Sequence, residues 1–190
     1  MLYLNTEVLT LSPYYYNAER HVDVQCPLHL HPHLEIIYVS EGQVVLNVNG
    51  NDRCLKAGQA TFIMPYEQHS FATAEHSRCF VLVFSHELVA DFYETIQHRS
   101  LMTTVFQPDP NTISFCEGLL SEKSPEVMTV KAVLYPMCRE VRNNCEFSSA
   151  GRAPDKIFVE AVRYVQQQFE TGGRSPLPPP PKHSTFTAPT

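Results

Sequence analysis

The sequence predicts a mainly β protein with a helical part, in which an antiparallel β-barrel is followed by packed helices. Short apolar segments separated by turn residues fill residues 22–84, which is typical of a barrel or sandwich. After Ser85 the apolar residues recur at intervals of three and four, which is typical of helices. Hydrophobic residues make up 43% of the 190 residues, so the chain has enough apolar material for a buried core.

The predicted strands follow one another through recognisable turns. Residues 34–40 form an apolar strand that ends at Glu41-Gly42, and residues 44–48 alternate toward Asn49-Gly50. Asn-Gly favours a two-residue hairpin because both central residues of a type I′ turn have positive φ. The later strands are expected at residues 52–55, 60–64 and 79–84. Together they predict an all-β unit within residues 1–84.

A helical region is expected over residues 85–147. Ser85 is the predicted N-cap of a first helix, Pro108-Asp109-Pro110 interrupts the chain, and two helices follow at residues 111–120 and 126–145. The last helix carries an apolar seam of five residues: Val127, Val130, Leu134, Met137 and Val141.

The apolar seam has two interpretations. It is either core in a monomer or the interface of a homodimer, and sequence does not choose between them. We expect the homodimer, because soluble monomers seldom expose such a stripe. Pro136 lies within the seam and is expected to bend or split the helix.

The C-terminal residues change in composition. Residues 148–155 read as a linker, residues 156–171 as one more helix, and residues 172–190 as a Pro-rich, disordered tail.

The charge balance excludes some classes of partner. The net charge is −6, from fourteen Lys and Arg against twenty Asp and Glu, and no basic run is present, so autonomous DNA binding is not expected. No stretch approaches the roughly 20 apolar residues of a membrane-spanning helix. Met1 is not followed by the pattern of a signal peptide, so we expect a cytoplasmic protein.

A histidine-rich segment is the densest chemical feature. His29, His31 and Glu35 have the same parity, so in a strand they face one side of the sheet, and His69 can join them from a neighbouring strand. Three imidazoles and a carboxylate are a possible ligand set for a divalent metal ion. The same side chains can instead line an organic ligand pocket, and both interpretations stay open.

These residues resemble the motifs of the cupin superfamily. The pattern His29-x-His31-x3-Glu35-x6-Gly42 is similar to the first cupin motif, and a second includes His69. Glu67 departs from the second motif because it replaces an inner glycine. The resemblance implies a double-stranded β-helix, or jelly roll. As an alternative function it implies a metal-dependent cupin enzyme, a dioxygenase or isomerase.

Over residues 27–170 the chain resembles an AraC-type transcription regulator. The resemblance implies an effector-binding barrel, a helical dimerisation region and the first helix of a truncated helix-turn-helix domain. It also implies a non-enzyme that binds a small, sugar-like effector, that needs no cofactor unless one divalent metal ion is bound, and whose full-length relatives bind DNA. The expected ligand-binding residues are His29, His31, Glu35, Tyr38 and His69. We hypothesise that the tail is a frameshifted remnant of the DNA-binding domain.

Overall fold

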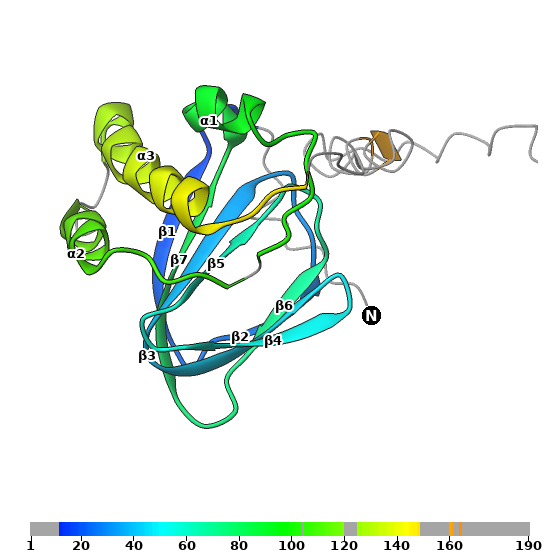
Figure 1. The fold of residues 1–190 in the computed structure, drawn as a ribbon, viewed down its shortest axis with the longest axis vertical. Helices are drawn as coiled ribbons and strands as arrows, with labels where there is room; N and C mark the ends of the chain where they lie inside the picture. Colours follow the sequence, from blue (N-terminus) through cyan, green and yellow to red (C-terminus); the bar gives the residue numbers. More distant parts are fainter. Residues whose placement is uncertain (1–11, 104, 120–124, 149–159, 162–163, 165–190) are drawn as a thin grey trace, which may run out of the picture.

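The strands form one strongly curled antiparallel sheet, a half-barrel, with helices on one side (Figure 1). The computed structural model describes residues 12–103, 105–119, 125–148, 160, 161 and 164. The expected mainly β fold with a few helices is confirmed. The strands are β1 (Tyr16–Val22), β2 (Gln25–His29), β3 (Leu34–Val48), β4 (Asn51–Lys56), β5 (Ala60–Ile63), β6 (His69–Ala72) and β7 (Ser77–Phe84).

Strand β3 joins the two halves of the curled sheet. Its first half pairs with β5 and β7, and its second half pairs with β4 and β6. The predicted turn at Glu41-Gly42 is wrong, because a bulge between Val39 and Glu41 lets one strand continue. Gly42 has φ +69, and a Cβ there would collide with the backbone carbonyl of His76. The glycine therefore permits both the bend and the close approach of the neighbouring loop.

The predicted Asn49-Gly50 hairpin is confirmed. The two residues have φ values of +50 and +81, and β3 pairs with β4 directly across them. The strand expected at residues 60–64 corresponds to β5, and the one at residues 79–84 lies within β7. Sequence reasoning set no bounds for β2 and β6, although His29 and His69 were expected on strands. It missed β1, which pairs along its whole length with β7.

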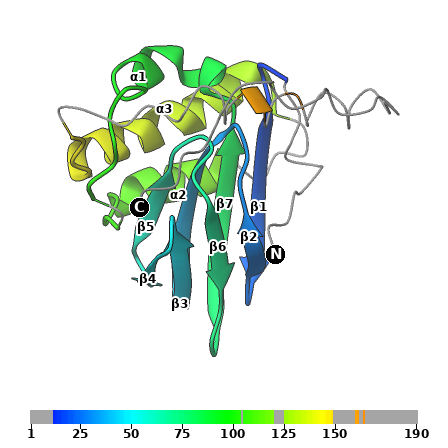
Figure 2. The same cartoon turned by 90° about the vertical axis from the view of Figure 1, so that its right-hand side faces the viewer.

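The helices cover the outer face of the half-sheet formed by β1, β7, β3 and β5 (Figure 2). They are the short 3₁₀ helix η1 (His86–Val89), α1 (Ala90–Glu94), α2 (Pro110–Leu119) and α3 (Val127–Asn144). The Ser85 hydroxyl does not cap η1 as expected, because it donates a hydrogen bond to the Pro13 carbonyl at 2.6 Å instead. Pro136 lies inside α3 without splitting it.

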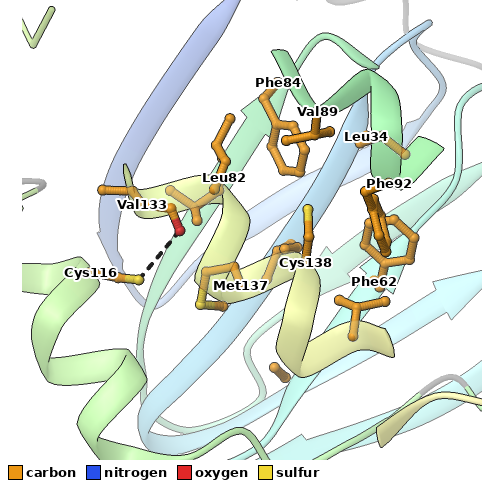
Figure 3. Close-up of a cluster of buried hydrophobic side chains, with 14 of the residues drawn as sticks. Leu34, Phe62, Leu82, Phe84, Val89, Phe92, Cys116, Val133, Met137 and Cys138 are labelled. Carbon is orange, nitrogen blue, oxygen red and sulfur yellow. Dashed lines mark hydrogen bonds between the residues drawn. The ribbon is translucent and has the colours of Figure 1, made fainter. Parts of the chain in front are cut away.

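The apolar seam of α3 is core within one chain. Val130, Leu134, Met137 and Val141 are buried in the cluster that also contains sheet residues such as Leu82 (Figure 3). The expectation that these four side chains form an intersubunit surface is therefore wrong. The outer face of the sheet is itself apolar, and the apolar face of α3 packs against it.

The fifth seam residue differs from the other four. Val127 lies at the start of α3 and is 47% exposed.

A second core fills the inside of the curl. It is built from both halves of the sheet by Val24, Ile37, Val39, Val44, Leu46, Leu55, Ile63, Phe71 and Cys79. The alternation of β3 explains the two cores, because Ile37 and Val39 point inward whereas Leu34 and Ile36 point toward the helices.

The C-terminal predictions fall largely outside the described residues. Apart from residues 148, 160, 161 and 164, this holds for the linker, the last helix and the Pro-rich tail. Within the described part of the chain, no helix is both long and apolar enough to span a membrane.

Candidate ligand-binding and metal site

The structure brings together the four side chains of the predicted cluster. His29 ends β2, His31 lies in the β2–β3 loop, Glu35 is on β3 and His69 begins β6. All four are buried, and one potential ligand atom from each lies within 4.8 Å of the others. Two features of the backbone cause this: His29 pairs directly with His69 in the β2–β6 ladder, and β3 runs beside β6.

Glu35 is the centre of the cluster. Its Oε2 lies 2.8 Å from Nε2 of His31 and 3.2 Å from Nε2 of His69. The ring of His29 stands beside the ring of His69, with centroids 4.1 Å apart. A single carboxylate oxygen is thus shared by two imidazoles in a buried space.

Backbone carbonyls orient two of the imidazoles. Nδ1 of His29 donates to the carbonyl of Pro27 at 2.9 Å, and Nδ1 of His69 donates to the carbonyl of Glu67 at 2.8 Å. With Nδ1 as the donor, Nε2 of a neutral ring carries the lone pair. This arrangement is typical of metal-binding histidines, whose second nitrogen is held by a backbone or carboxylate acceptor.

The electrostatics of the cluster favour a charged Glu35. Burial opposes ionisation of this carboxyl, but the charges of and hydrogen bonds from His69 and His31 hold its pKa well below the usual range. Burial by itself would lower the pKa of His69. The charge of Glu35 and the hydrogen bonds to Glu35 and Glu67 outweigh this effect, so the pKa of His69 is raised. Burial, together with the charge of His69, lowers the pKa of His29 to about 4. His29 is therefore a neutral ring at pH 7.

The donor set fits a divalent metal ion. The carboxylate and the three imidazoles offer oxygen and nitrogen ligand atoms, and Nδ1 of His31 has no hydrogen-bond partner among the described residues. Ligand atoms about 2.1 Å from an ion are about 3.4 Å apart in a tetrahedral site and about 4.2 Å apart across an octahedral one, so the 4.8 Å spread has to contract when an ion binds. Three nitrogens and one oxygen suit Zn, Fe, Mn or Ni.

A cavity of about 310 Å³ opens beside the cluster. His29, His31 and Glu35 line one part of it, and the remaining wall comes from β1, β2, β6, β7 and the β1–β2 turn. Its polar lining includes Asn17, Glu19, His21 and Gln25, and its apolar lining includes Phe71, Val81 and Val83. The polar residues of β1 were missed by sequence reasoning, although the alternation of Asn17, Glu19 and His21 was a usable signal.

Tyr38 does not line this cavity, so its expected role in ligand binding is wrong. It stands three residues from Glu35 and therefore faces the other side of β3. Its ring lies 5.3 Å from that of Phe80 and packs against the helix-facing core.

His33, the remaining histidine of this segment, is also buried. It stacks on Tyr15 at 4.4 Å, outside the four-residue cluster.

Residues 20–85 match the family described as Cupin domain (Cupin_2). These residues form a cupin domain. The match includes the whole histidine cluster and all strands from β2 to β7. No curated protein matches the sequence.

Several solved structures are similar in fold to the cupin domain. An RmlC-like cupin from Shewanella frigidimarina is 20% identical with a TM-score of 0.32, covering 42% of this chain and 84% of that protein. The DMSP lyase DddQ from Ruegeria pomeroyi is 23% identical with a TM-score of 0.34, covering 39% of this chain and 40% of the lyase.

A further likeness extends beyond the cupin domain at a lower sequence identity. Apo ToxT from Vibrio cholerae is 10% identical with a TM-score of 0.49, covering 86% of this chain and 66% of ToxT. None of these likenesses assigns an activity to this chain.

Proposed function

We propose that this chain is the effector-sensing and dimerisation module of an AraC-type transcription regulator, and that a small, sugar-like ligand binds in its cupin domain. The observation that carries the proposal is the helical layer, since α3 places Leu134, Met137 and Val141 in one core with the sheet. A cavity in the cupin domain thus lies in the same folded unit as the helices. That arrangement supports a module in which ligand binding can affect the helical part.

The lining of the 310 Å³ cavity supports a sugar-like ligand. The side chains of Asn17, Glu19 and Gln25 offer donors and acceptors for hydroxyl groups. Val81 and Phe71 offer an apolar wall for the carbon face of a sugar ring. Glu19 and Glu35 disfavour an anionic ligand.

A homodimer remains part of the proposal, but through a different surface. Four of the five seam residues are buried, and the large apolar side chains that are exposed on the described parts of α2 and α3 are Phe115, Val127, Met128 and Tyr135. These residues support an intersubunit contact made by the outer face of the helical layer. The net charge of −6 supports the further expectation that DNA binding belongs to full-length relatives and not to this chain alone.

The ligand proposal is tested by calorimetric titration of the purified chain with a panel of aldopentoses and aldohexoses. We expect at least one sugar to bind, and Gln25→Ala to weaken it at least tenfold, because Gln25 lines the cavity. Tyr38→Phe is the matched control, since Tyr38 faces away from the cavity, and it is expected to leave affinity unchanged. Absence of binding by every sugar, with the protein folded, would refute the sugar-like ligand.

The four-residue cluster favours a second candidate function, a metal-dependent cupin enzyme of the dioxygenase or isomerase type. His29, His31, Glu35 and His69 would hold a divalent ion, which supplies Lewis-acid or redox chemistry when bound. The carbonyls of Pro27 and Glu67 orient two of the imidazoles, and burial keeps bulk water from the cluster.

Elemental analysis of the purified protein discriminates the two functions. A stoichiometric iron, manganese or nickel ion that is lost in Glu35→Gln would support the enzyme. A metal-free protein that binds a sugar would support the sensor.

A further inference from the structure

Glu67 lies in the loop before β6 and contacts His69 through its backbone. It stands two residues before His69. Its backbone carbonyl accepts the hydrogen bond from Nδ1 of His69 at 2.8 Å. The backbone of Glu67 therefore orients an imidazole of the cluster, and its side chain can in turn hold this part of the backbone.

The Glu67 carboxylate is tied to two separate segments. Its Oε2 accepts a hydrogen bond from the backbone N–H of Met64 at 3.0 Å. Its Oε1 accepts one from the Asn49 side-chain amide at 3.1 Å. Met64 follows β5 and Asn49 belongs to the β3–β4 hairpin, so the carboxylate links the loop before β6 to a neighbouring rigid turn.

Asn49 reinforces this link through the next residue. Its backbone N–H donates to the carbonyl of Gln68 at 2.8 Å, and its side-chain oxygen accepts from the Gln68 N–H at 3.2 Å. The peptide units on either side of Gln68 are thus held by one hairpin. Position and direction of the Glu67 carbonyl follow from these bonds.

The loop before β6 contains a strained turn. Within the turn from Met64 to Glu67, Tyr66 adopts φ +65, a region that a bulky side chain rarely occupies. This conformation costs free energy and persists only where the surroundings hold it. The bond from the Met64 N–H to the Glu67 carboxylate spans the turn from one end to the other.

We propose that Glu67 is a positioning residue: its carboxylate holds its own backbone carbonyl in place, and this carbonyl keeps the His69 ring in the orientation that directs Nε2 at Glu35. The proposal rests on the proposed function in one respect, that the His69 ring contacts the ligand or ion bound at the cluster. Glu67 itself touches neither.

The test compares Glu67→Gly, which removes the whole side chain, with Glu67→Gln, which keeps the size but alters one acceptor. Asn51→Ala is the matched control, because it removes side-chain hydrogen bonds to the carbonyls of Val48 and Asn49 in the same hairpin but keeps the Asn49 side chain that binds Glu67 and Gln68. Three quantities are measured for each variant: the His69 Nδ1 proton by NMR, the dissociation constant of Co²⁺ by calorimetry, and the melting temperature.

We expect Glu67→Gly to lose the protected Nδ1 proton of His69 and to weaken Co²⁺ binding by about 10- to 100-fold, as is usual when the partner of a metal-binding histidine is disturbed. Glu67→Gln should fall between wild type and the glycine variant, and Asn51→Ala should match wild type in both quantities. If Glu67→Gly does not fold, the glutamine variant decides.

The proposal is overturned if the Glu67 variants melt earlier yet keep the His69 proton and a Co²⁺ affinity within twofold of wild type, because Glu67 would then be only a structural brace. A wild type that binds no Co²⁺ refutes the metal site and not this proposal. In that case the His69 proton alone decides the role of Glu67.

Discussion

Replacing Leu134 with alanine distinguishes the core position of the α3 seam from an intersubunit role. Leu134 is 0% exposed and belongs to the cluster between α3 and the sheet. Truncating a fully buried leucine costs about 2–5 kcal/mol, because apolar contacts are lost and a cavity remains. In a chain of this length about 1 kcal/mol shifts the melting temperature by roughly 2–4 °C, so we expect a fall of about 4–20 °C.

The measurement combines thermal and urea unfolding with sedimentation velocity. Asn143→Ala is the matched control on the same helix, because Asn143 is exposed and its loss should change stability by less than about 0.5 kcal/mol. We expect Leu134→Ala to unfold at lower urea while it sediments as the wild type does. If instead its urea midpoint is unchanged and a wild-type dimer becomes a monomer, the seam is an interface and the reasoning fails.

Three further predictions concern other parts of the fold. Gly42→Ala should lower the free energy of unfolding, measured by urea titration, more than Gly50→Ala. Both glycines have positive φ, a conformation that costs alanine about 1–2 kcal/mol. Only at Gly42 would the added Cβ also collide with the backbone. Burial raises the pKa of the Cys145 thiol to about 12, above the roughly 8.5 of an unfolded thiol. The stability that this shift contributes is complete below about pH 8.5 and declines as pH rises toward 12. The urea midpoint should therefore fall in this range, and fall less in Cys145→Ala; equal slopes would contradict the assignment. Tyr38→Phe should lower stability by less than about 1 kcal/mol in thermal melts, since its ring packing is retained; a larger loss would show that the hydroxyl has a structural partner.

Local patterns in the sequence were sufficient for several features. The hairpin at Asn49-Gly50 follows from the backbone preferences of two adjacent residues, and no distant contact is needed. Odd parity indicated that His29, His31 and Glu35 come together, but the three residues do not share one strand: they meet because β2 and β3 both lie beside β6. The same rule excludes Tyr38 from the cavity, so its inclusion was an error of application and not a limit of sequence reasoning.

Other features depend on neighbours that the local sequence does not reveal. Glu41-Gly42 reads as a turn, yet it is a bulge in one long strand, because β7 and the loop at His76 lie against it. Polar β1 carries little apolar signal, and its place beside β7 is set by backbone pairing.

The α3 seam and the role of Glu67 show what the sequence alone determined and what only the tertiary structure decided. The spacing of the seam determined that one face of a helix is apolar, but the surface that covers this face is chosen by the packing of the whole chain. Likewise, the motif indicated that His69 joins Glu35. The support of His69 by Glu67 and Asn49 appears only when the loop before β6 meets the β3–β4 hairpin. Periodicity specifies which side of a helix or strand is apolar or polar. Which residues pack against that side depends on how the whole chain folds.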